Sequence, residues 1–182
     1  LVGTILDPFC GTGVVLQEAA LLGYRPYGTD LSEKMVDYST KNLDWLIKKY
    51  QLSTDTRIEQ GDAMNHHWST PISAVVTETY LGQPFSAPPS PAKLIEVRGN
   101  CNHIVTEFLK NIASQLASGT PLTLAIPAWR GQDSGFVHLP LVGSLSKLGF
   151  QHISLKHARS EQLLYYRENQ IVARELLLLK KS

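Results

Sequence analysis

A loop rich in glycine follows the first apolar segment of the chain. Residues 3–6 (GTIL) predict a buried strand, and residues 7–13 (DPFCGTG) follow directly, before a predicted helix over residues 14–22. Glycine has no Cβ atom, so Gly11 and Gly13 tolerate unusual backbone angles and let a ligand approach the backbone amides closely. An acidic residue at a strand end, followed by two spaced glycines before a helix, is typical of a ligand-binding loop.

Two more aspartates follow predicted strands. Asp30 ends a predicted strand over residues 25–29, and Asp62 follows a predicted strand over residues 57–60. An acidic residue roughly 20 positions after a glycine loop binds ribose hydroxyls in nucleotide sites. The dinucleotide fingerprint itself is incomplete, because residues 14–18 (VVLQE) contain no third glycine. Taken singly, each aspartate is more typical of local structure, Asp30 as a helix-entry residue and Asp62 as a turn residue.

The glycine loop also resembles a known motif. The run DPFCGTG is similar to motif I of class I S-adenosylmethionine (SAM) dependent methyltransferases, in the version carried by enzymes that methylate exocyclic amines of nucleic-acid bases. The resemblance implies that SAM is the cofactor and that three strand ends bind it: Asp7, Pro8, Phe9, Gly11, Gly13, Asp30, Asp62 and Ala63. Asp7 would face the cationic methionine end, and Asp30 would accept hydrogen bonds from both ribose hydroxyls. Asp62 and Ala63 would contact the adenine edge.

The segment after the fourth predicted strand departs from the pattern of that family. Amine methylases of this group carry Asn/Asp/Ser-Pro-Pro-Tyr/Phe there: the polar group accepts hydrogen bonds from the amine, and the aromatic ring stacks on the extruded base. Residues 77–82 are TETYLG, so Tyr80 fits and both prolines are missing. The resemblance implies catalytic roles for Glu78 as the acceptor and Tyr80 as the stacking platform. Alternatively, Tyr80 closes the strand end against residues 83–91, a four-proline loop that is either a substrate-facing lid or a spacer.

Several segments together resemble a more specific group of methyltransferases. Motif I, the Gly28-Thr29-Asp30 run, Tyr80 with Gly82, and the tail segments 166–167 and 174–177 are similar to the THUMP-associated tRNA guanine-N2 methyltransferase group. The resemblance implies an RNA methyltransferase with tRNA as its substrate. It also implies an RNA-binding region N-terminal to this chain, so we expect a catalytic domain, residues 1–182, at the C-terminal end of a longer protein. Two other functions stay open: a DNA adenine-N6 or cytosine-N4 methylase, and a SAM-binding module without catalysis. A helper subunit also stays open.

Composition excludes several classes of protein. With 182 residues, 43% of them apolar and 18% charged, the chain is typical of one soluble globular domain. A net charge of +1 is too small for a module that holds nucleic acid by itself, so another domain or a local basic patch must supply the phosphate contacts. No apolar run approaches the roughly 20 residues that span a bilayer. With two cysteines and no signal peptide in view, we expect a reducing, cytoplasmic setting and no membrane partner.

Strand and helix signals alternate along the chain, which favours βαβ units and a mainly parallel sheet. The resemblance implies the Rossmann-like α/β fold of class I methyltransferases: a seven-stranded, mostly parallel sheet with an antiparallel last strand and helices on both faces. The other predicted helices cover residues 33–50 after the N-cap Ser32, residues 91–118 with an irregularity at Gly99 and Asn100, and residues 139–148. The other predicted strands cover residues 72–77, 121–126, 151–156, 163–166 and 171–179, the last two joined as a hairpin by a turn at 168–170.

Two histidines and a tryptophan are of types that bind metals or bases in some proteins, but their positions in this sequence do not indicate such a site. His66 and His67 are adjacent and lack the spacing of zinc ligands, so we expect a surface loop and no metal. Trp129 follows the fifth predicted strand, where it either stacks on a base or packs in the core.

Overall fold

The computed structural model describes residues 3–85, 87–131, 135–168 and 170–182. Its strands are β1 (Thr4–Asp7), β2 (Arg25–Asp30), β3 (Arg57–Gln60), β4 (Ala74–Glu78), β5 (Pro121–Arg130), β6 (Phe136–Val137), β7 (Phe150–His152), β8 (Leu164–Tyr165) and β9 (Val172–Lys181). The α-helices are α1 (Val14–Leu21), α2 (Glu33–Tyr50) and α3 (Pro91–Ala113), and the 3-10 helices are η1 (Pro140–Leu148) and η2 (Ser160–Leu163). None of the described helices is long and apolar enough to cross a bilayer.

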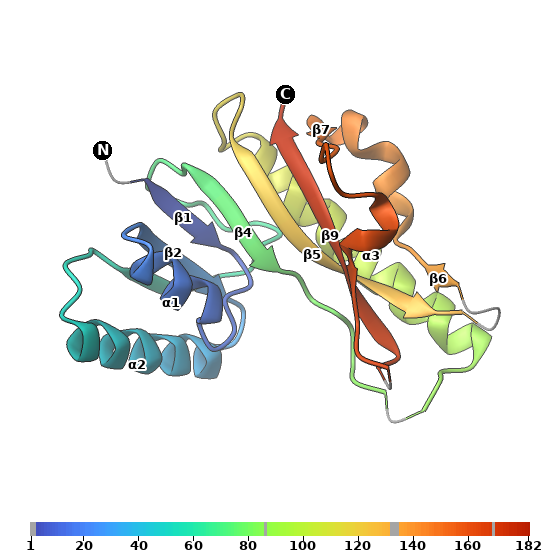
Figure 1. Cartoon of the computed structure of the whole chain (residues 1–182), viewed down its shortest axis with the longest axis horizontal. Coiled ribbons are helices and arrows are strands. Elements are labelled where there is room, and N and C mark those ends of the chain that lie inside the picture. Colours follow the sequence, from blue (N-terminus) through green and yellow to red (C-terminus); the bar gives the residue numbers. More distant parts are fainter. Residues whose placement is uncertain (1–2, 86, 132–134, 169) are drawn as a thin grey trace.

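The strands form one mixed sheet, whose main path has the order β3-β2-β1-β4-β5-β9-β7. The first five strands of this path are parallel, and β9 lies antiparallel between β5 and β7. The short strand β6 extends the sheet beside β5 (Figure 1), and the short strand β8 pairs with β9. The predicted mostly parallel sheet with an antiparallel last strand is therefore confirmed, as is the pairing of β8 with β9. Residue 169 of the predicted turn and residue 86 of the proline loop lie outside the described residues.

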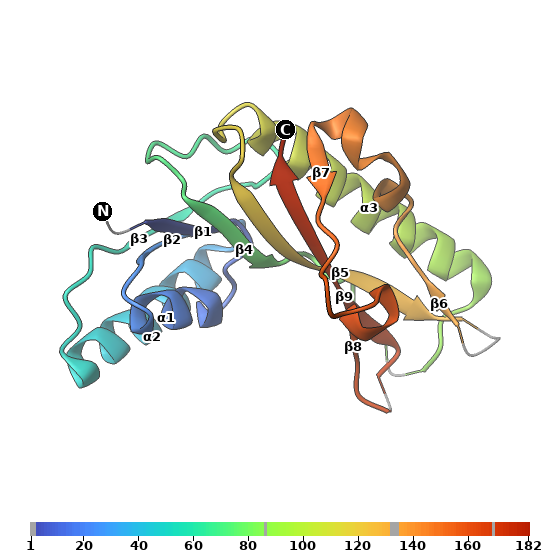
Figure 2. The same cartoon turned by 45° about the horizontal axis from the view of Figure 1, so that its top comes forward.

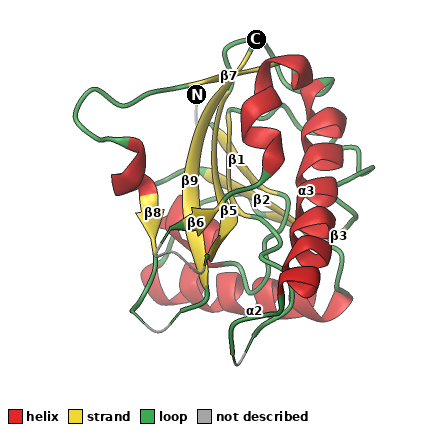
Figure 3. Ribbon diagram, turned by 90° about the vertical axis from the view of Figure 1, so that its right-hand side faces the viewer, coloured by secondary structure: helices red, strands yellow, loops and turns green. Residues whose placement is uncertain are grey.

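Helices cover both faces of the sheet. Figure 2 shows α1 and α2 beneath the strands β1 to β4 and α3 on the opposite side, and Figure 3 shows the twisted sheet beside α3. Two apolar clusters correspond to these layers. The larger joins α3 to the central strands and includes the buried Phe108 and Leu124. The smaller lies under α1 and α2 and includes the buried Leu16 and Leu43.

β5 is four residues longer than predicted because its partners change along its length. Residues Leu122 to Ala125 pair with β4 on one side, and β9 pairs with β5 from Pro121 to Trp129 on the other. Pro127 has no N–H to donate. It lies beyond the end of β4, so the missing N–H removes no hydrogen bond between β5 and β4. The pairing with β9 carries the strand on to Arg130.

Two predictions about helices were wrong. α3 runs without interruption through Gly99 and ends at Ala113, not near Gly119. A glycine inside a helix costs only about 1 kcal/mol, and the burial of Val97, Cys101 and four later residues on the same helix outweighs that cost. Residues 140–148 form a 3-10 helix instead of an α-helix. The seventh strand is also shorter than predicted, since only Phe150–His152 pairs with β9.

Candidate functional site

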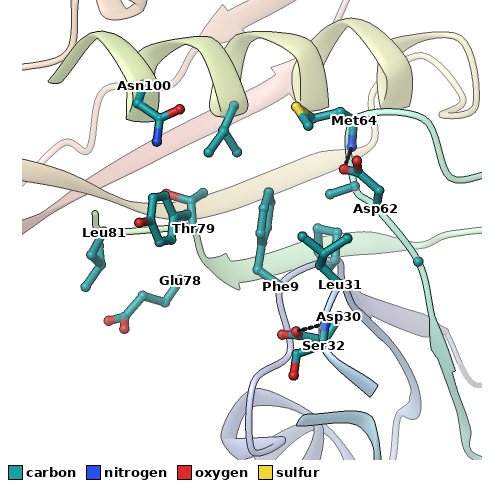
Figure 4. Close-up of a pocket in the computed structure, with 15 residues that line it drawn as sticks. Phe9, Asp30, Leu31, Ser32, Asp62, Met64, Glu78, Thr79, Leu81 and Asn100 are labelled. Atoms are coloured by element: carbon teal, nitrogen blue, oxygen red, sulfur yellow. Dashed lines mark hydrogen bonds between the residues drawn. The ribbon is translucent and has the colours of Figure 1, made fainter. Parts of the chain in front are cut away.

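The carboxyl ends of β1, β2, β3 and β4 meet at one edge of the sheet and enclose a pocket of about 670 Å³. The order of the strands reverses between β1 and β4, and ligands of open α/β sheets bind at such a switch point. Figure 4 shows Phe9 in the middle of the pocket. Asp30, Ser32 and Asp62 lie on one side of it, and Glu78, Leu81 and Asn100 lie on the other. The pocket therefore has two ends.

Most of the residues predicted for the site line this pocket. Those on its walls are Pro8, Phe9, Asp30, Asp62, Ala63, Glu78 and Tyr80. Asp7, Gly11 and Gly13 lie close by in the chain, but they do not belong to the walls. The structure therefore brings residues from four strand ends, spread over more than 70 positions, around one cavity.

The glycine loop has the backbone shape that its sequence predicts. Gly11 and Gly13 have φ angles of +52° and +85°, in the left-handed region that favours glycine. A Cβ atom on Gly13 would also collide with the hydroxyl of Ser39 on α2. The loop can therefore pass close to α2 and start α1 at Val14 only with glycine at this position.

Asp30 connects the glycine loop to the start of α2. Its Oδ2 accepts a hydrogen bond from the amide of Gly11, and its Oδ1 accepts one from the amide of Ser32, both at 2.9 Å. The predicted N-cap Ser32 occupies the cap position, but its own side chain makes no capping hydrogen bond. Asp30 is thus a helix-entry residue and a wall of the pocket at once. Each carboxylate oxygen keeps a second lone pair for a ligand.

Asp7 directly precedes the wall residues Pro8 and Phe9 and is only 2% exposed. Its Oδ1 accepts hydrogen bonds from the hydroxyl of Thr77, at 2.5 Å, and from the amide of Phe9, at 3.1 Å. Burial raises the pKa of Asp7 to about 7; these two hydrogen bonds lower the pKa, and the charges of Asp30 and Glu78 raise it further. Asp7 therefore ties β1 to β4, and it titrates near neutral pH.

Sequence reasoning missed Thr77. The four-residue motif begins with a polar residue and ends with an aromatic one. If Tyr80 is the aromatic residue, Thr77 is the polar one, and this alignment was the signal that the sequence offered. Its side chain is buried, and its hydroxyl donates to Asp7. Glu78 lines the pocket and is exposed, so it is the acidic acceptor at this strand end that a ligand can reach.

The turn after β3 places Asp62 and Ala63 against α3. The Oδ1 of Asp62 accepts a hydrogen bond from the amide of Met64 at 2.9 Å, so the predicted turn role is real. Asn111 on α3 donates to the carbonyl oxygen of Ala63 at 3.0 Å and fixes the turn. The half-buried His66 contacts Glu59, and the described residues contain no group of three or more potential ligands for a metal.

Glu78 and Tyr80 form the other end of the pocket. Tyr80 is 41% exposed and borders both this pocket and a neighbouring cavity. The Oε2 of Glu78 accepts a hydrogen bond at 2.8 Å from the Nε of Arg174, a residue of β9 that sequence reasoning did not connect with the site. Trp129 is fully buried, so it packs in the core and cannot stack on a base.

The pocket fits SAM in size, charge and surface. Its volume lies within the range of about 300–1,000 Å³ that small-molecule sites occupy. All charged side chains among its described wall residues are carboxylates: Asp30, Asp62 and Glu78. SAM carries one net positive charge, which these carboxylates attract. Apolar walls from Phe9, Leu31 and Met64 suit a purine ring.

Comparisons with known proteins agree with this geometry. The family described as "RMKL-like, methyltransferase domain" matches residues 2–101. The tRNA (guanine(10)-N2)-dimethyltransferase of Methanothermobacter thermautotrophicus is 32% identical over 130 residues, which are 71% of this chain and 34% of that protein. The protein of the same name from Pyrococcus abyssi is 36% identical over 83 residues, 46% of this chain and 21% of its own length.

A solved structure has the same fold. The crystal structure of TrmN from Thermus thermophilus aligns with 99% of this chain and 44% of its own, with a TM-score of 0.60 and 21% identity. At this identity the likeness concerns the fold alone. The chain spans about a third of the length of the first curated relative and about a fifth of the second.

Proposed function

The chain belongs to the RMKL-like methyltransferase domain family, and on this premise we propose that it methylates an exocyclic amine of a nucleic-acid base. SAM is the methyl donor, guanine N2 is the target, and tRNA carries the guanine. The observation that supports this proposal most is the pocket with two ends, one beside the glycine loop and one beside Glu78 and Tyr80. The names of both curated relatives support the choice of guanine N2 and tRNA.

At the first end, residues of the glycine loop and of β2 and β3 hold the cofactor. Asp30 accepts hydrogen bonds from the ribose hydroxyls, because its carboxylate is already oriented by the amides of Gly11 and Ser32. Ala63 and Asp62 contact the adenine edge, and the apolar wall near Phe9 covers the ring. The buried Asp7, next to the wall residue Pro8, attracts the cationic methionine end. When bound, SAM supplies an electrophilic methyl group on a sulfonium.

At the second end, Glu78 and Tyr80 hold the base. A bound SAM would supply its methyl group to the amine nitrogen with the sulfonium sulfur as the leaving group, and the amine would then release a proton. Glu78 accepts a hydrogen bond from the amine through Oε1, the oxygen that Arg174 does not occupy, and the same carboxylate accepts that proton. Tyr80 stacks on the base, and the exposure of its ring supports this role.

The RNA itself needs contacts beyond this pocket. The net charge of +1 supplies little attraction for phosphates, so we propose that an RNA-binding region outside the chain, or a local patch on it, holds the tRNA. The domain is then the catalytic part of a cytoplasmic RNA methyltransferase.

Methyl transfer from labelled SAM to tRNA and to duplex DNA, by the protein at its full natural length, tests this proposal. We expect labelled N2-methylguanosine in tRNA, and a loss of about 100-fold or more in rate with Glu78→Ala, because the amine loses the group that orients it. Glu107→Ala is the matched control, since Glu107 is also an ion-paired glutamate but lies outside the pocket. Label in DNA alone would contradict the choice of RNA. SAM binding without methyl transfer to either polymer would contradict the proposal that the domain is catalytic.

A further inference from the structure

Arg174 connects the pocket to a second cavity. Its Nε donates to Glu78 at 2.8 Å, across 96 positions of sequence. A guanidinium group has five N–H donors. In Arg174, the Nε is the one donor with a hydrogen-bond partner among the described residues. The fork of Nη groups is therefore held in one orientation by Glu78, while its donors have no partner among the described residues.

The cavity beside Arg174 has a volume of about 320 Å³ and lies between residues 81–85 and the segment 170–174. It shares Leu81 with the pocket that holds Glu78 and Tyr80, so the two spaces adjoin. Figure 4 shows the Glu78 carboxylate pointing away from Phe9, on the side of Leu81. The cavity therefore adjoins the end of the main pocket that Glu78 borders.

The polar side chains on the walls of this cavity, those of Gln83, Gln170 and Arg174, all carry N–H donors. Gln170 lines it, and the Oε1 of Gln170 already accepts a hydrogen bond at 3.1 Å from the amide of Arg167, which leaves its NH₂ group for a ligand. Gln83 brings a second amide, and none of the described wall residues is acidic. A cation with a fixed fork of donors, supported by amide donors, is the arrangement that recognises a phosphate through two parallel hydrogen bonds.

We propose that this cavity, defined by Gln83, Gln170 and Arg174 and called the Arg174 subsite, binds the phosphate that joins the target nucleotide to its neighbour. The inference rests on the proposed function, since it takes the occupant of the main pocket to be a base of a polynucleotide. Arg174 then has two roles: it holds Glu78 through Nε, and it binds the phosphate through its Nη groups. Phosphate binding thereby favours the orientation of the carboxylate that meets the amine.

The salt dependence of methyl transfer tests the subsite on the protein at its full natural length. We compare wild type, Arg174→Gln and Arg174→Lys, with tRNA as the probe. Loss of one charged phosphate contact raises KM for tRNA roughly tenfold. It also reduces the slope of log(kcat/KM) against log[salt] by about 0.7 to 1. Arg174→Lys keeps the charge and so keeps the slope. The affinity for SAM stays unchanged in both variants.

Two controls separate this role from a merely structural one. Arg57→Gln removes an arginine that is also paired with a glutamate, Glu59, but lies at the far edge of the sheet, so both KM and slope stay at their wild-type values. In a Glu78→Gln background, Arg174→Gln still raises KM and reduces the slope, because the Nη groups of Arg174 make the phosphate contact themselves; the sizes of the two effects differ from those in wild type, since Arg174 and Glu78 are in contact.

The outcomes distinguish the two proposals. A wild-type protein that methylates tRNA, with a slope that Arg174→Gln leaves unchanged, would overturn the subsite and leave the proposed function standing. The subsite would also be overturned if Arg174→Gln had no effect in the Glu78→Gln background. A wild-type protein that binds SAM but methylates no RNA would overturn the proposed function, and the subsite with it.

Discussion

Replacing Asp7 with asparagine tests the account of the buried carboxylate. Asparagine keeps an oxygen that can accept the hydrogen bonds from Thr77 and Phe9, but it cannot ionise. Burial raises the pKa of Asp7 from 3.8 to about 7, so the folded state binds the proton more tightly than the unfolded state does. Stability therefore falls as the pH rises from about 4 to 7, and the cost is fully present above pH 7.

The magnitude follows from the size of the pKa shift. A shift of about 3 units corresponds to roughly 4 kcal/mol of unfolding free energy at pH 8, at about 1.4 kcal/mol per unit. Part of this cost is already present at pH 5, so about 2 to 3 kcal/mol develops between pH 5 and pH 8. Asp7→Asn removes this contribution. Between pH 5 and pH 8 the unfolding free energy of the variant therefore falls by about 2 to 3 kcal/mol less than that of wild type.

Urea unfolding at several pH values measures the difference. The control is Asp55→Asn, which removes the same charge from an exposed position, and it keeps the wild-type dependence on pH. If Asp7→Asn lost stability between pH 5 and pH 8 as steeply as wild type, Asp7 would not be the buried group that titrates, and the reasoning would be wrong.

Other outcomes follow from the same geometry. Because a cationic ligand favours the ionised form of Asp7, the affinity for SAM should rise between pH 6 and pH 8 by up to about tenfold, and calorimetry on Asp7→Asn should show a flat profile. Gly13→Ala should lose about 1 to 2 kcal/mol more unfolding free energy than Gly23→Ala in denaturant titrations. Both glycines have φ above +80°, but only Gly13 meets a neighbour, Ser39. Tyr80→Ala should reduce kcat/KM for RNA about tenfold or more while Tyr80→Phe stays near wild type, and a loss of SAM affinity in either variant would contradict a role for Tyr80 at the base.

Local sequence signals located the elements that build the end of the pocket beside the glycine loop. The helix over residues 33–50 begins and ends where predicted, because the polar cap position, the apolar face and the end of the pattern are all local features. The glycine loop follows from the same kind of signal, since φ above zero at Gly11 and Gly13 requires glycine. These features identify the candidate site without knowledge of distant contacts.

Distant contacts were beyond the reach of sequence patterns. Thr77 meets Asp7 because β1 and β4 are neighbours in the sheet, although the two residues are 70 positions apart. Arg174 meets Glu78 because β5 pairs with β4 on one side and with β9 on the other. The same pairing explains why β5 extends to Arg130 when the apolar pattern ended at Ile126. Register between strands is set by tertiary packing, which a single sequence does not display.

A calorimetric titration of SAM into the chain tests the central claim most directly, which is that the pocket at the switch point binds this cofactor. We predict binding at one site in wild type and none in Asp30→Ala, with a circular dichroism spectrum showing that the variant is folded. The reason is that Asp30 both lines the pocket and holds the glycine loop through Gly11. Absence of binding in wild type, or equal binding in a folded Asp30→Ala variant, would contradict the account.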